Sequence, residues 1–180
     1  MKMTNRMRRN SPVTRGMLYA ALISAAAIVG CGEAEDSAVT ALRQKLELST
    51  APNDATSVSE IRKTLMEADA AAEIDVVLRG RIWAGELPPW EDGKAAFVLT
   101  DATGHDGDDD HDPHACPFCS RDIDDYIAAI RFHNDDGTVA AIDSRELFDV
   151  KEKQMVMIKG RGSMNGERLK VDATNIFIAR

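Results

Sequence analysis

The chain has few cysteines, histidines and aromatic residues, and it has no long apolar run. Among 180 residues there are three cysteines, four histidines, two tryptophans, two tyrosines and five phenylalanines. The longest apolar run, between Gly16 and Cys31, holds about a dozen apolar residues, whereas a membrane-spanning helix needs about 20. No segment repeats itself, and the length suits one domain of ordinary size. The sequence therefore argues against a membrane-spanning helix.

Acidic residues are absent from the first 31 positions, which carry five basic residues instead. A basic start, a short apolar core and small residues at its end are typical of a secretory signal. The last four residues of this stretch, IVGC, resemble the lipobox of bacterial lipoproteins. The resemblance implies cleavage before Cys31, a diacylglyceryl thioether on its sulfur, and Cys31 as the mature N-terminus. A plain signal anchor, or cleavage elsewhere with Cys31 incidental, stays open.

Basic residues are scarce beyond the signal. After position 31 the chain has 17 Lys and Arg against 30 Asp and Glu, so its net charge is near −13. Such a surface repels phosphate backbones, which argues against a nucleic-acid partner. The sequence leaves open an unknown protein, peptide or glycan partner, beside the membrane reached through the lipid anchor. We expect an extracytoplasmic protein, lipid-anchored to a bacterial membrane on the periplasmic side or at the cell surface.

The mature chain begins with helical patterns and continues with β patterns. Residues 32–56 are acidic and rich in small residues, as in a tether. Ser57 and Glu60 have capping-box spacing and are followed by apolar residues at helical intervals, which predicts a helix over 58–70. A helical turn is expected over 143–150. Five stretches have the alternation and branched residues of strands, namely 73–83, 95–101, 127–134, 154–162 and 168–180.

Five strands with a short helix between the third and the fourth is the order of an OB-fold, a small Greek-key barrel. Gly80 and Gly160 lie mid-strand, where barrel strands bend sharply. The phrases VVLRGRIW, AAFVLTD, MVMIKGRG and LKVDATNIFIAR resemble anticodon-binding-type OB domains. We therefore expect a mainly β protein: a signal at 1–31, a tether with a short helix at 32–71, and an OB-fold-like domain at 72–180. Another small β-barrel or sandwich is the alternative.

Most of the scarce histidines and cysteines gather in the predicted loop at 102–126, which contains GHDGDDDHDPHACPFC. Two thiolates with CxxC spacing can grip one ion, and zinc accepts four thiolate and imidazole ligands in a tetrahedron. Zinc is the expected metal, and copper suits the same soft ligands. The preferred set is the two cysteines with His111 and either His114 or His133. The candidate ligands are Cys116, Cys119, His105, His111, His114 and His133.

Other interpretations of this loop stay open. The CPFC motif resembles the active-site frame of glutaredoxin-like proteins, although that family needs a preceding strand where this chain has aspartates. The two cysteines also suit a tight disulfide within a solvated acidic loop. DGDDDHD lacks the residue order of a calcium-binding EF-hand. The overall arrangement resembles uncharacterised exported OB proteins with a His-rich CPFC insertion, a resemblance that implies architecture and no activity.

The barrel face offers a second candidate site, with Trp90 in the Pro-Pro loop expected as its exposed aromatic residue. The candidate residues on this face are Trp83, Trp90, Arg79, Arg81 and Arg131. No catalytic constellation is evident, so we do not expect an enzyme. Two functional hypotheses follow. One is a membrane-anchored binding module whose loop is pinned by a metal or a disulfide. The other is a lipoprotein that stores or delivers zinc or copper through the loop itself.

Overall fold

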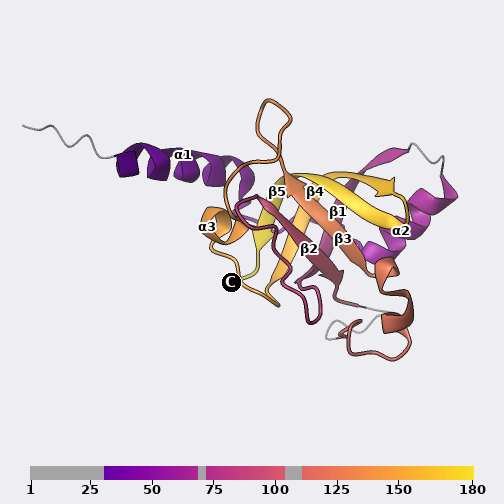
Figure 1. Cartoon of the computed structure of the whole chain (residues 1–180). Coiled ribbons are helices and arrows are strands. Elements are labelled where there is room, and N and C mark those ends of the chain that lie inside the picture. Colours follow the sequence, from indigo (N-terminus) through magenta and orange to yellow (C-terminus); the bar gives the residue numbers. More distant parts are fainter. Residues whose placement is uncertain (1–30, 69–71, 104–110) are drawn as a thin grey trace, which may run out of the picture. The chain divides into compact units, whose positions relative to one another are not determined.

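The computed structural model (Figure 1) describes residues 31–68, 72–103 and 111–180. The predicted signal at 1–30, the candidate ligand His105 and the side chain of Cys31 lie outside the described residues. None of the described helices is both long enough and apolar enough to cross a membrane.

The described residues form five strands, β1 (Glu73–Ile82), β2 (Ala96–Asp101), β3 (Ile127–Phe132), β4 (Met155–Asn165) and β5 (Arg168–Ile178). They close into one barrel in the order β1-β2-β3-β5-β4. Neighbouring strands pair antiparallel except β3 and β5, which are parallel. The short helix α3 (Ser144–Phe148) lies between β3 and β4 in the chain. This strand order confirms the expected mainly β, OB-fold-like architecture.

Alternation along the strands fills the barrel. On β1 every second residue from Val76 to Ile82 is buried, and the residues between them, such as Arg79 and Arg81, are more exposed. At the end of the barrel beside α3, Phe132 contacts Phe148 with ring centroids 4.8 Å apart. The core is therefore built from the inward faces of the strands together with the apolar residues of α3.

Gly160 marks a bend in β4 that its neighbours impose. The register between β4 and β5 shifts between Lys159 and Gly160. A Cβ on Gly160 would lie 2.4 Å from the carbonyl oxygen of Asp172 on β5, a distance that no side chain tolerates. Glycine therefore allows the close approach of the two backbones that the bent strand requires.

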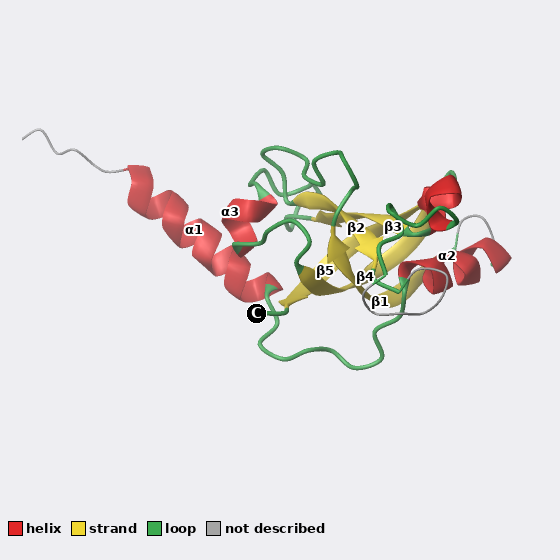
Figure 2. Ribbon diagram, turned by 90° about the horizontal axis from the view of Figure 1, so that it is seen from below, coloured by secondary structure: helices red, strands yellow, loops and turns green. Residues whose placement is uncertain are grey.

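Helices occupy both ends of the barrel (Figures 1 and 2). At one end, α2 (Val58–Glu67) packs Val58 and Leu65 into the core. The Ser57 hydroxyl accepts from the Glu60 N–H at 3.2 Å, as the capping-box spacing predicts. The helix ends before the predicted residue 70, because the backbone of Ala68 is extended.

The helix α1 (Cys31–Leu46) lies at the other end of the barrel, beside α3. The segment expected as an acidic tether, 32–56, begins with this helix of 16 residues, and the second half of the helix packs on the domain. Leu46 is buried, and the Arg43 guanidinium donates to the carbonyl oxygens of Glu146 and Leu147. The apolar spacing of Val39, Leu42 and Leu46 explains why this part of the expected tether docks.

Candidate metal centre

The loop that carries the histidines and cysteines leaves the barrel between β2 and β3, through a narrow neck. At the neck the Asp101 N–H donates to the Tyr126 carbonyl at 2.7 Å. The Asp101 carboxylate is buried and accepts four hydrogen bonds, from the N–H and hydroxyl groups of Ser59 and Thr103. These bonds tie the start of the loop to the first turn of α2, so the loop begins from a fixed point.

His114 fastens the middle of the loop to the barrel. The Thr100 hydroxyl donates to the Trp83 carbonyl at 2.6 Å, so its oxygen accepts from His114 Nε2 at 3.1 Å. The imidazole meets Trp83 edge-on and lies over Gly85, where a Cβ would come within 2.7 Å of His114 Nδ1. Burial lowers the pKa of His114, although the negative charge of Asp112 partly raises it. The lowered pKa favours the neutral imidazole at pH 7.

Three potential ligands converge beyond this anchor. One ligand atom each from His111, Cys116 and Cys119 lie within 4.8 Å of one another, and Cys119 Sγ is 3.3 Å from His111 Nε2. Cys119 is buried and Cys116 is partly exposed, and neither cysteine forms a disulfide. We call these three residues the His/Cys trio.

Backbone N–H groups converge on the sulfur of Cys116. It accepts hydrogen bonds from the N–H groups of Cys119 and Phe118, and the bond from Cys119 is the main cause of its lowered pKa. Hydrogen bonds to the charged form of a group favour that form. The turn from Cys116 into the 3-10 helix η1 (Cys119–Asp125) therefore supports a thiolate, which is the species that binds metal.

Tyr126, at the end of η1, supports the second sulfur. Its hydroxyl forms a hydrogen bond with the side chain of Cys119. Burial, followed by this interaction, raises the pKa of Tyr126 to about 12. The phenol therefore keeps its proton and can donate it to a Cys119 thiolate. Such outer partners orient metal ligands and tune their basicity.

One distance within the trio is close to that expected in a tetrahedral metal site. In a tetrahedral site, with Zn–S near 2.3 Å and Zn–N near 2.0–2.1 Å, sulfur and nitrogen lie roughly 3.5 Å apart. The 3.3 Å between Cys119 Sγ and His111 Nε2 is close to that value. Among the described residues no fourth His, Cys, Asp or Glu joins the group. The described part of the chain thus offers three groups that could occupy positions of a tetrahedral metal site.

The other two described histidines make contacts elsewhere. His114 bonds Thr100, as given above, and His133 Nε2 lies 3.5 Å from Asp172 Oδ1 on β5. Neither joins the trio. The expected completion of the ligand set by His114 or His133 is therefore absent from the described structure.

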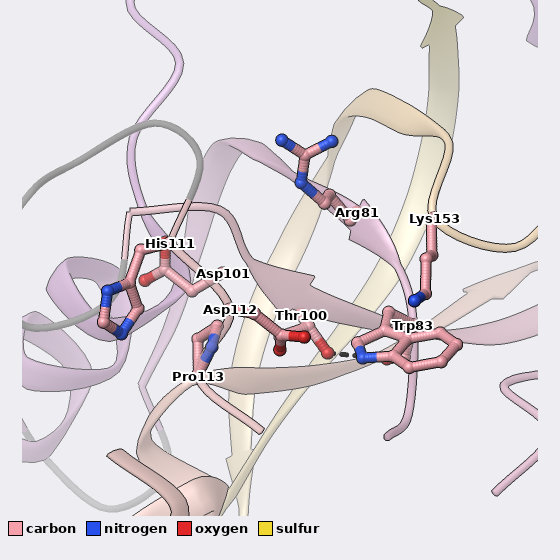
Figure 3. A pocket seen from close by; sticks show the side chains of 8 residues that line it. All are labelled: Arg81, Trp83, Thr100, Asp101, His111, Asp112, Pro113 and Lys153. Atoms are coloured by element: carbon pink, nitrogen blue, oxygen red, sulfur yellow. Dashed lines mark hydrogen bonds between the residues drawn. The ribbon is translucent and has the colours of Figure 1, made fainter. Parts of the chain in front are cut away.

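The candidate residues of the barrel face do not form one surface. Trp83 and Arg81 line a cavity beside the loop (Figure 3), whereas Trp90 and Arg131 line a groove over β2 and β3. Arg79 lines neither of these two sites. Trp90, expected to be exposed, is half-buried against Phe97, because the Val98 N–H donates to the Pro89 carbonyl and folds the Pro-Pro loop onto β2.

Sequence reasoning missed the residues that support the trio. Neither Tyr126 nor Thr100 belongs to a recognisable motif. Tyr126 ends the predicted loop, and Thr100 lies in the predicted strand at 95–101. Asp101 looked like the end of a strand. One signal was available for Tyr126, because it is one of two tyrosines in the chain and directly precedes a predicted strand.

Comparisons with known proteins yield only distant structural likenesses. No protein family and no curated protein matches the chain. Among solved structures, the aspartyl tRNA synthetase from Entamoeba histolytica is 11% identical with a TM-score of 0.41, covering 74% of this chain and 24% of that one. A putative aspartyl-tRNA synthetase from Leishmania major Friedlin is 13% identical with a TM-score of 0.42, covering 81% and 26%. The chain thus spans about a quarter of each synthetase.

Proposed function

We propose that this chain is a metal-binding OB module whose loop after β2 holds one zinc or copper ion through the His/Cys trio. The observation that supports this proposal most is that the ligand atoms of His111, Cys116 and Cys119 lie within 4.8 Å of one another. Hydrogen bonds to the two sulfurs also support the proposal, because they favour thiolates. Backbone N–H groups donate to Cys116, and the Tyr126 hydroxyl bonds Cys119. A solvated acidic loop requires none of these contacts.

We also propose a cellular location for the protein. The basic, apolar and small-residue pattern of the first 31 residues, ending in IVGC, supports export and a lipid anchor on Cys31. The module would then face the periplasm or the exterior, and would meet a protein, peptide or glycan partner near the membrane. A Cys31→Ser variant is expected to lose its membrane association in fractionated cells, and retention of that association would contradict the anchor.

A count of bound metal beside a count of free thiols tests the metal site. Protein purified under reducing conditions is expected to carry about one equivalent of zinc or copper by elemental mass spectrometry. The Cys116→Ser/Cys119→Ser variant and the His111→Gln variant should lose it. His133→Gln is the matched control, because its imidazole makes a contact elsewhere. Equal metal loss in His111→Gln and His133→Gln would contradict the assignment of the trio.

Among the described residues the trio offers three ligands, and this favours one further candidate function, the storage or delivery of the ion. Closed structural zinc sites have four protein ligands, whereas sites with three keep a position open for exchange. An open site should transfer its ion to a chromophoric chelator faster than a closed four-cysteine site does, and equally slow transfer would favour a structural role. If the protein carried no metal and its two thiols readily formed a bridge, the CPFC motif would be a thiol–disulfide pair instead.

A further inference from the structure

The two cysteines of the His/Cys trio lie close enough to bond to each other as well as to an ion. Their sulfurs are within 4.8 Å of each other. The Ser120 N–H donates to the Cys116 carbonyl at 3.0 Å and closes one helical turn around the pair. Such a turn sets Cα atoms three residues apart at about 5 Å, and a disulfide spans roughly 4.4–6.8 Å. A bridge therefore needs only a local adjustment of the two side chains.

The two cysteines differ in their access to solvent. Cys116 is partly exposed, whereas Cys119 is 1% exposed. Cys119 is enclosed by its neighbours, because its sulfur lies 3.3 Å from His111 Nε2 and forms a hydrogen bond with the Tyr126 hydroxyl. The residues between the cysteines, Pro117 and Phe118, are exposed. A dissolved reagent therefore reaches Cys116 first, and Cys119 is reached through Cys116 or after the loop opens.

The loop is attached to the barrel by contacts that involve neither sulfur. At its neck the Asp101 N–H donates to the Tyr126 carbonyl at 2.7 Å, and farther along His114 Nε2 lies 3.1 Å from the Thr100 hydroxyl. Formation of a bridge between the cysteines would leave both contacts in place. A change in the state of the two sulfurs is therefore compatible with a folded and anchored loop.

We infer that the trio is a redox-controlled metal site, in which a bond between Cys116 and Cys119 expels the ion and reduction of that bond restores binding. The inference rests on the proposed metal site, because it concerns how that site releases its ion. Thiolates are the form of cysteine that binds metal, so a bridge leaves His111 as the one remaining ligand of the trio. Oxidising surroundings, such as those outside the cytoplasm, would favour release.

The oxidant in this step is a disulfide of low molecular mass, such as glutathione disulfide. The Cys116 thiolate attacks one sulfur of this reagent, forms a mixed disulfide and releases one thiolate. The Cys119 thiolate then attacks the Cys116 sulfur, which forms the internal bridge and releases the second thiolate. The two protein thiolates together lose two electrons and the reagent gains them. The metal ion leaves with its charge unchanged.

Zinc release under glutathione disulfide tests the switch. The full chain with Cys31→Ser is used, so that two thiols remain. The zinc-loaded protein is treated with glutathione disulfide or, as the reference, with reduced glutathione. A chromophoric chelator reports released zinc, and mass spectrometry reports the bridge. We expect about one zinc ion released per bridge, no release in the reference, and renewed zinc binding after dithiothreitol.

Two single variants in the same chain, free of metal, test the order of the steps. In Cys119→Ser the Cys116 thiol should form a stable glutathione adduct, because no second thiol displaces it. In Cys116→Ser the buried Cys119 should react at least about tenfold more slowly, because the loop must open first. Urea denaturation establishes that each variant is folded. Equal rates in the two folded variants would overturn the assignment of Cys116 as the first to react.

The same measurements separate this inference from the metal site. If reduced protein binds zinc but keeps it under glutathione disulfide, or loses it without forming the bridge, the switch is overturned and the metal site stands. If reduced protein binds no zinc, the metal site is overturned and the switch with it. Release that matches bridge formation and is reversed by dithiothreitol supports both.

Discussion

His111 and His114 have different roles although only two residues separate them. The chain turns at Asp112, whose carbonyl accepts from the N–H groups of Ala115 and Cys116, both at 3.1 Å. This turn directs His114 to Thr100 on the barrel, while His111 Nε2 lies 3.3 Å from Cys119 Sγ. One imidazole therefore anchors the loop, and the other lies beside a cysteine of the trio.

Tyr126 gives the first prediction at the residue scale. In Tyr126→Phe the ring stays, but the hydroxyl that bonds Cys119 is lost. Removal of such an outer partner typically lowers metal affinity by about 10- to 100-fold. We expect one equivalent of metal still to bind, with an affinity lowered by about tenfold in competition with a chelator. An unchanged affinity would mean that the hydroxyl does not act on the thiolate. The stability of the metal-free variant serves as the control for folding.

Gly160 and Gly162 allow a matched prediction at the scale of the strand. Gly160→Ala would place a Cβ 2.4 Å from the Asp172 carbonyl oxygen, which is backbone and cannot move aside. At Gly162 the nearest atom is a side-chain carbon of Val76 at 3.0 Å, which can yield. We expect Gly160→Ala to lower the free energy of unfolding by about 2 kcal/mol or more, and Gly162→Ala by less. Urea denaturation measures both, and equal losses would refute the requirement for close backbone approach.

The N-cap of α3 gives a pH-dependent prediction. The Asp143 carboxylate accepts from the Arg145 N–H and guanidinium, and the side-chain bond to Arg145 is the main cause that lowers its pKa from 3.8 to about 2. The folded protein therefore binds this proton less tightly than the unfolded chain does. The stabilisation is complete above about pH 4 and is lost as the pH falls toward 2.

Asp143→Ala is thus expected to cost about 1 kcal/mol at pH 7, the usual value of an N-cap. The difference from the unaltered protein should shrink as the pH is lowered from 4 toward 2, as followed by denaturant unfolding. Asp92→Ala is the control, because Asp92 also pairs with Arg145 but its side chain is 91% exposed. A difference that stays constant down to pH 3 would show that the charge of Asp143 does not contribute.

The sequence predicts the barrel well because each strand carries its own signal. Alternation gave β1, the NG turn joined β4 to β5, and Gly160 marked the bend that the register shift places at Lys159 and Gly160. Contacts between segments that are distant in the sequence could not be predicted from it. The docking of α1 depends on the carbonyls of Glu146 and Leu147, and the burial of Trp90 depends on the Pro-Pro loop folding onto β2. Neither contact leaves a local pattern.

The same limit applies to the candidate site. CxxC spacing predicted that Cys116 and Cys119 lie together, because two thiolates three residues apart can share an ion whatever surrounds them. Spacing could not distinguish among the histidines, since their roles depend on which barrel residue each one meets. Thr100 receives His114 and Asp172 lies beside His133, and both partners are distant from the CxxC motif in sequence.

Metal removal tests whether the loop and the barrel unfold in one cooperative transition. The loop joins the barrel through the Asp101–Tyr126 bond at its neck and through His114 on Thr100. If these contacts couple the two parts, zinc at about 100 times its Kd should stabilise the fold by about 2.7 kcal/mol and raise Tm by roughly 10 °C. The Cys116→Ser/Cys119→Ser variant should show no shift, and should melt where the metal-free protein does. If zinc binds to the protein but does not change its Tm, the loop opens before the barrel unfolds.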